Sequence, residues 1–123
     1  MKVLIIEDDQ ETVDVISLAF KMRWPEVELV SAKLGEEGLQ LFEDESPQAL
    51  ILDLGLPDIS GFEVLRRIRN VSNVPVVIMS VRRDEAIVVK AIEYGANEYI
   101  TKPFRQLVLL DKLKELACGE LSR

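Results

Sequence analysis

The sequence predicts a doubly wound α/β domain with a parallel sheet, because short apolar runs alternate five times with longer amphipathic stretches. The runs are continuously apolar, which is typical of parallel strands that are buried on both faces. The length of 123 residues suits one domain, and 48% apolar residues suffice for a hydrophobic core. The expected strands are Val3–Ile6, Val27–Val30, Ala49–Leu52, Val76–Met79 and a short one around Tyr99–Ile100.

Five helices are expected in the segments between and after these strands, because apolar residues recur there at helical spacing. The first helix should end at Trp24-Pro25, since proline cannot continue a helix. Gly95 and Gly119 are the expected stops of the last two helices. The apolar faces in chain order are Val13, Ile16 and Phe20; Leu39 and Phe42; Val64, Leu65 and Ile68; Val88, Val89 and Ile92; and Leu109, Leu113 and Leu116.

Composition excludes several classes of function. The chain has no histidine, which rules out Ser/His/Asp and Cys/His catalysis, histidine metal sites and a phosphohistidine carrier. Cys118 is the sole cysteine, so no internal disulfide can form. The formal net charge of −7 argues against direct nucleic-acid binding by this domain. We find no bilayer-spanning apolar run and no signal peptide, and therefore expect a soluble cytoplasmic protein without membrane contact.

Polar residues stand where the expected strands end. Glu7, Asp8 and Asp9 follow the first strand. Asp53, Ser80 and Lys102 end the third, fourth and fifth strands, respectively. The carboxyl ends of strands in an open parallel sheet form the crevice that binds ligands, so these side chains should meet at one edge.

The charges of that edge predict a metal-assisted phosphoryl site. The carboxylates of Glu7, Asp8 and Asp53 would repel one another unless some were protonated or a cation lay among them. A set of a few oxygen ligands suits Mg²⁺. A carboxylate can also act as a nucleophile and form an aspartyl-phosphate, while Ser80 and Lys102 stabilise phosphoryl oxygens. Asp53 is the best nucleophile candidate, because it ends a strand in the middle of the sheet.

Each of these residues has a structural explanation when taken alone. The acids after the first strand favour a helix start, and Asp53 could cap a helix or belong to a turn. Ser80 alone would be structural and Lys102 alone would be a surface lysine. The joint placement of all of them on one sheet edge favours the functional interpretation.

Four segments carry a resemblance to a known family. They are Ile6-Glu7-Asp8-Asp9, Asp53-Leu54-Gly55-Leu56-Pro57-Asp58 with Gly61, Met79-Ser80, and Gly95-Ala96-Asn97-Glu98-Tyr99-Ile100-Thr101-Lys102-Pro103-Phe104. Each is weak by itself, but all four in this order and at these spacings are highly specific. Over essentially its whole length the chain resembles the receiver domain of bacterial two-component response regulators.

The resemblance implies a flavodoxin-like five-stranded sheet of order 2-1-3-4-5 with five helices. It implies a receiver domain over residues 1–119, with residues 120–123 as a C-terminal tail or the start of a linker to an effector domain. It also implies that Asp53 accepts a phosphoryl group from a sensor histidine kinase. Such a domain is a switch that promotes its own phosphorylation and dephosphorylation, and is not a turnover enzyme.

The resemblance also assigns roles to single residues. Mg²⁺ or Mn²⁺ would be bound by Asp8 directly, Glu7 through water, Asp53, and the backbone carbonyl of Gly55. Ser80 and Lys102 would hold the phosphoryl oxygens, and the Lys102–Pro103 peptide bond would be cis. Tyr99 would be the switch aromatic that turns inward when Ser80 moves toward the phosphate.

Two alternatives to the phosphorylation switch remain. Val81 follows Ser80 where the family usually has a small residue, and its branched side chain would slow both phosphorylation and dephosphorylation. This departure leaves room for a receiver-like interaction module that signals without phosphorylation. An aspartyl-phosphate phosphatase is disfavoured, because Gly55, two residues after Asp53, cannot act as a general acid.

The last helix carries more apolar residues than one buried face can hold. Leu107, Val108, Leu109 and Leu110 are consecutive, so some of them should be exposed. With Val88 they could form an apolar patch on the fourth helix, fifth strand and fifth helix, which would serve a homodimer or an effector contact. Lys90 and Lys112 fit the charged pattern by which the family's winged-helix transcription factors pair two receivers. Val108 and Asn97 occupy places where that branch usually carries acids.

Overall fold

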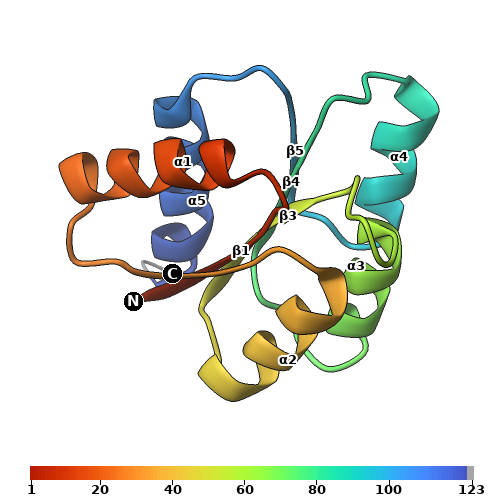
Figure 1. The fold of residues 1–123 in the computed structure, drawn as a ribbon, viewed down its shortest axis with the longest axis horizontal. Coiled ribbons are helices and arrows are strands. Elements are labelled where there is room, and N and C mark those ends of the chain that lie inside the picture. The colour runs from red at the N-terminus through yellow and green to blue at the C-terminus, as the bar shows by residue number, and fades with distance from the viewer. Residues whose placement is uncertain (122–123) are drawn as a thin grey trace.

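A computed structural model describes residues 1–121 of the chain, with side chains described through residue 117. Five parallel strands form one sheet in the order β2-β1-β3-β4-β5, which confirms the fold class and the strand order (Figure 1). The strands are β1 (Lys2–Ile6), β2 (Glu28–Ala32), β3 (Ala49–Asp53), β4 (Val76–Ser80) and β5 (Glu98–Thr101). β3 therefore lies in the middle of the sheet and β5 at one edge.

Helices cover both faces of the sheet. α1 and α5 lie together on one face, and α2, α3 and α4 lie on the other (Figure 1). The helices are α1 (Gln10–Arg23), α2 (Gly35–Glu45), α3 (Gly61–Arg69), α4 (Glu85–Glu93) and α5 (Gln106–Leu121). Among the described residues, no helix has the length and apolarity that crossing a membrane requires.

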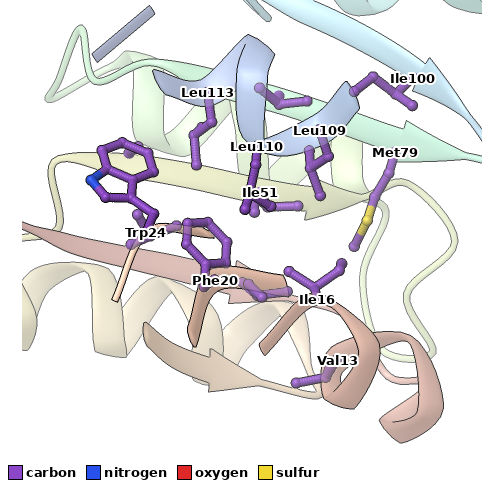
Figure 2. Close-up of a cluster of buried hydrophobic side chains, with 14 residues drawn as sticks. Val13, Ile16, Phe20, Trp24, Ile51, Met79, Ile100, Leu109, Leu110 and Leu113 are labelled. Atoms are coloured by element: carbon purple, nitrogen blue, oxygen red, sulfur yellow. The ribbon is translucent and has the colours of Figure 1, made fainter. Parts of the chain in front are cut away.

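The continuous apolar runs supply two cores because successive strand side chains point to opposite faces. In β1, Val3 and Ile5 join the core beneath α1 and α5, whereas Leu4 and Ile6 join the core beneath α2, α3 and α4. Figure 2 shows the first core, in which Phe20 of α1 and Leu113 of α5 belong to the same cluster as Ile51 of β3. A strand buried on both faces must be apolar at every position, which explains the runs.

Element positions differ from the sequence prediction in a few places. The second strand is Glu28–Ala32 and not Val27–Val30, and its last residue Ala32 pairs with Ile6.

α1 ends as expected, with Trp24 as its C-cap. The last helix, expected to stop near Gly119, continues slightly further and ends at Leu121. A glycine inside a helix costs only about 1 kcal/mol relative to alanine, so it does not stop a helix by itself. Of the expected tail 120–123, residues 122 and 123 lie outside the described part.

The apolar face expected for the fourth helix is also wrong. Val89 is 47% exposed and Ile92 is 46% exposed, while Ala91 is fully buried. α4 thus packs on the sheet through a small residue, with Ile87 partly buried against the same core. Helical spacing alone cannot distinguish two adjacent apolar faces on so short a helix, and the small Ala91 allows the closer approach. Val89 and Ile92 consequently lie at the surface, while Val88 is half-buried.

Candidate functional site

The buried polar side chains among the described residues are Glu7, Asp53 and Ser80. Each stands at or just after the carboxyl end of a strand: Glu7 follows β1, Asp53 ends β3 and Ser80 ends β4. The register places Ser80 beside Thr101 of β5, and the backbone N–H of Lys102 donates to the Ser80 carbonyl at 2.7 Å. Parallel pairing therefore brings four distant segments to one edge of the sheet.

Carboxylates converge at this edge around one ammonium group. Carboxylate oxygens of Glu7, Asp8 and Asp53 lie within 4.8 Å of one another. The Lys102 ammonium contacts Oε1 of Glu7 directly and lies 3.6 Å from Oδ1 of Asp53. The Lys102–Pro103 peptide bond that follows β5 is cis. One lysine against three carboxylates leaves the cluster formally negative.

Within the cluster, the pKa of Glu7 is shifted most strongly. Burial raises the pKa of Glu7 to about 7, because the charged form is poorly solvated there and the nearby Asp53 carboxylate opposes a second negative charge. The hydrogen bond from Lys102 acts in the opposite direction and only partly offsets the increase. Burial also lowers the pKa of Lys102, but the hydrogen bond to Glu7 and the charge of Asp53 outweigh it and raise that pKa overall. The lysine is therefore held in its charged form.

These residues fit a hard divalent cation. The donor atoms are all oxygens, they converge within one coordination sphere, and their negative charge exceeds that of the lysine. Mg²⁺ prefers oxygen ligands and binds through a few carboxylates while it keeps several waters. Asp8 is exposed, whereas Glu7 and Asp53 are buried, so the cluster reaches from the interior to solvent.

A cavity of about 360 Å³ opens over Asp53. Its polar lining includes Asp53, Ser80, Arg82 and Lys102. The Ser80 hydroxyl accepts from the backbone N–H of Arg82 at 3.0 Å, and the half-buried Tyr99 donates its hydroxyl to the Arg82 carbonyl at 2.8 Å. Tyr99 is therefore linked to the segment that follows Ser80, and the exposed Gly55 lies on the cavity wall.

Two residues of the resemblance motif, Asp58 and Gly61, support the site through contacts that the sequence did not predict. The Asp58 carboxylate accepts from the backbone N–H groups of Gly35 and Glu36 at 2.8 and 2.9 Å, which ties the loop after β3 to the start of α2. Gly61 leaves no room for a side chain, since an added Cβ would lie 2.5 Å from the Asp53 carbonyl oxygen. Both belong to the Asp53–Asp58 and Gly61 motif, but the sequence alone does not show what they contact.

Val81 stands beside the site with 70% of its surface exposed. It lines the cavity over Asp53 and also a second hollow of about 390 Å³ between α1 and the start of α5. If Asp53 is the phosphoacceptor that the resemblance implies, Val81→Ala should raise its rates of phosphorylation and dephosphorylation severalfold, because the smaller side chain opens the approach to the carboxylate. Phosphorylation by a small donor and the decay of the product, both followed by intact-protein mass spectrometry, would measure this. Unchanged rates would contradict it.

The interface candidates separate onto three surfaces. Lys90 lies over the Phe62 ring at 4.3 Å and near Tyr94, so it faces α3. Leu107 is exposed but lines a small hollow with Trp24, so it faces α1. Lys112 lies 3.6 Å from Glu98 of β5, and Val108, one helical turn earlier, is 42% exposed. Lys112 therefore lies against β5, while the role of Val88, Lys90, Leu107 and Val108 in an interface stays a prediction.

Comparison with known proteins assigns the family. The family described as the response regulator receiver domain matches residues 3–114, from β1 into α5. The chain belongs to the response regulator receiver domain family. The match spans every element that carries the site described above.

Relatives and solved structures agree with this assignment. The receiver domain is 38% identical over 106 residues to the transcriptional regulatory protein AfsQ1 of Streptomyces coelicolor, which covers 86% of the chain and 46% of AfsQ1. It is 35% identical over 112 residues to KdpE of Mycobacterium tuberculosis, covering 91% of the chain and 49% of KdpE. The chain thus spans about half the length of these relatives.

Two solved receiver domains have the same fold. The Francisella response regulator 1452 receiver domain superposes with a TM-score of 0.89 at 26% identity, over 97% of this chain and 98% of that one. The beryllofluoride-activated N-terminal receiver domain of Klebsiella pneumoniae RstA gives 0.87 at 26% identity, over 95% and 97% of the two chains. The receiver domain is thus related to signalling regulators and to regulators of transcription.

Proposed function

We propose that this receiver domain accepts a phosphoryl group on Asp53 from a sensor histidine kinase and changes conformation to control an output. The observation that carries the proposal is the placement of Asp53. Its carboxylate is buried at the end of the central strand β3, lies 3.6 Å from the Lys102 ammonium, and borders a cavity that Ser80 also lines. A nucleophile, a fixed positive charge and a hydroxyl donor thus share one space.

Each side chain has a defined part in this chemistry. An oxygen of Asp53 attacks phosphorus, and the bond from phosphorus to the leaving group breaks with its electron pair on the leaving group. Lys102 neutralises charge on the transferred phosphoryl oxygens, and the Ser80 hydroxyl donates to one of them. Lys102 is well suited to this role because its raised pKa keeps it charged.

Glu7, Asp8, Asp53 and the Gly55 carbonyl are the proposed ligands of Mg²⁺ or Mn²⁺. The bound cation would neutralise charge on the phosphoryl oxygens during transfer. The support for this assignment is the convergence of carboxylate oxygens within 4.8 Å around a single lysine. A cation would also oppose the increase in the pKa of Glu7, which burial causes and the Asp53 carboxylate reinforces.

The proposed conformational change starts at Ser80. When its hydroxyl turns to the phosphoryl group, it gives up the hydrogen bond from the Arg82 backbone. The Arg82 carbonyl also holds the Tyr99 hydroxyl, so a movement of this segment frees Tyr99 to turn inward. Tyr99 lies on β5 between α4 and α5, and its rotation would change the surface of these elements (Figure 1).

That surface is the proposed output face. We assign Val88, Val108 and Lys112 to it and propose that two receiver domains pair there after phosphorylation. Because the two curated relatives are transcriptional regulatory proteins of about twice the matched length, we propose a receiver domain over residues 1–119 followed by a linker to an effector domain. The acidic receiver domain itself would not touch nucleic acid. It would act in the cytoplasm as a switch.

Beryllofluoride, which mimics a phosphoryl group on an aspartate, tests the proposal. We expect Mg²⁺-dependent binding by calorimetry, a mass increase of one phosphoryl group with acetyl phosphate, and a shift to a dimer in sizing chromatography. Asp53→Asn should abolish the first two, because an amide is neither a nucleophile nor an anionic ligand. Binding that persists in Asp53→Asn would overturn the phosphoacceptor assignment. No binding in the wild-type protein would favour the phosphorylation-independent interaction module.

A further inference from the structure

The cavity over Asp53 is lined by two cationic residues, which are Lys102 and Arg82. Lys102 is engaged, because its ammonium contacts Glu7 and lies 3.6 Å from Asp53. Arg82 instead pairs with Asp84. Its Nη2 lies 3.3 Å from Oδ2 of Asp84, and its Nε lies 3.5 Å from Oδ1. The guanidinium thus has an acidic partner that belongs neither to the metal cluster nor to the phosphoacceptor.

The backbone around Arg82 is fixed on both sides. Its N–H donates to the Ser80 hydroxyl and its carbonyl accepts from the Tyr99 hydroxyl. These bonds fix the Arg82 backbone at the rim of the cavity. Only the guanidinium end of the side chain can therefore move from one partner to another. Swinging that end between Asp84 and the cavity requires rotamer changes alone.

The pair between Arg82 and Asp84 is easy to exchange. The two side chains are 55% and 57% exposed, and ion pairs at such positions contribute little because water screens them. A phosphoryl group offers a guanidinium two parallel, charge-assisted hydrogen bonds and more negative charge than one carboxylate. A phosphoryl donor at the cavity would therefore compete well with Asp84.

The negative charge of the carboxylate cluster explains why a second cation at the cavity would help an anionic donor to bind. The cluster holds three carboxylates against the single lysine, so its field repels an incoming anion until a divalent cation balances it. A small acyl phosphate then adds two further negative charges. Besides Lys102, Arg82 is the cationic residue on the wall of the cavity, and it can pair with these negative charges.

We propose that Arg82 recruits a small, dianionic acyl phosphate to Asp53, and that Asp84 restrains self-phosphorylation by holding the Arg82 guanidinium. This inference rests on the proposed function of Asp53. In the reaction an Asp53 oxygen forms the new bond to phosphorus, the acyl oxygen–phosphorus bond breaks, and the carboxylate leaves with the electron pair. No further reactant is required. Arg82 is a positioning residue that acts on donor binding, and Asp84 sets how often it is available.

Phosphorylation by acetyl phosphate with Mg²⁺, followed by mass spectrometry over a range of donor concentrations, tests the inference. Arg82→Ala should lower the second-order rate by about threefold to tenfold, through weaker donor binding at an unchanged maximal rate. Asp84→Asn should raise it by about twofold to threefold. Asn keeps the shape of the side chain at the N-cap of α4, where Asp84 makes no capping hydrogen bond. Arg83→Ala, the exposed neighbour that does not line the cavity, is the matched control and should match the wild type.

The double variant Arg82→Ala/Asp84→Asn separates the proposed coupling from a general charge effect. If Asp84 acts by holding Arg82, the double variant should react at the rate of Arg82→Ala alone. If Asp84→Asn accelerates the reaction equally with and without Arg82, the restraint is overturned. If Arg82→Ala reacts like the wild type, or if Arg83→Ala is slowed as much, the recruiting role is overturned. Either result would leave the proposed function intact, whereas a wild-type protein that gains no phosphoryl group on Asp53 would refute that function itself.

Discussion

Gly61→Ala is expected to lower the free energy of unfolding by about 2 to 3 kcal/mol and to disable Asp53 as a ligand and acceptor. A methyl group at this position would lie 2.5 Å from the Asp53 carbonyl oxygen and 2.6 Å from the Leu54 Cα. Both are backbone atoms that no rotamer change can move. The Gly61 N–H also donates to the Leu54 carbonyl at 3.1 Å, so the start of α3 is bound to the end of β3.

The methyl group must therefore push the start of α3 away from β3 or displace Asp53 itself. Urea unfolding of the metal-free protein gives the loss of stability, and calorimetry with Mg²⁺ gives the loss of the site. Gly55→Ala is the matched control for stability, since its added Cβ would meet Asp53 Oδ2 at an ordinary 3.9 Å. If Gly61→Ala were as stable as Gly55→Ala, the close approach of α3 to β3 would not be what requires glycine.

The fold and the composition of the site could be predicted from the sequence, because apolar runs mark the strands and the residues that end these runs form the site. A run such as Ala49–Asp53, apolar until its last residue, places the carboxylate at the sheet edge once the strand is recognised. The convergence of Glu7, Asp53, Ser80 and Lys102 needs only parallel pairing of four such runs. Helix faces are less determined, as α4 illustrates, because Ala91 and the larger apolar residues define competing faces.

Contacts between side chains and backbone are what the sequence cannot predict. Nothing in the order of residues indicates that the Asp58 carboxylate accepts from the start of α2, or that Tyr99 holds the carbonyl of Arg82. These contacts depend on loop paths, which have no periodic signal. The surroundings of Lys90 and Leu107 could not be predicted for the same reason, since rotation of a helix about its axis is set by its neighbours.

Without metal, the receiver domain is expected to lose stability as the pH rises from about 4.5 to about 7, because of Glu7. Its pKa is raised from 4.5 to about 7 in the folded protein, so the folded state binds a proton more tightly than the unfolded chain does. The stability that this proton contributes is complete below pH 4.5 and is lost as the pH approaches and passes 7. The full difference corresponds to about 3 kcal/mol.

Glu7→Gln isolates this contribution, because glutamine keeps the size of the side chain and cannot ionise. Urea unfolding in the presence of a chelator measures the free energy of unfolding. Between pH 4.5 and pH 7.5, this free energy should increase by about 3 kcal/mol in the variant relative to the wild type. Glu43→Gln, which removes an exposed carboxylate of α2, supplies the background. Parallel curves for the wild type and Glu7→Gln would mean that Lys102 fully compensates the buried charge. A widening gap would mean that the folded protein holds Glu7 at an energetic cost, which is the condition under which a bound cation at this edge adds most to stability.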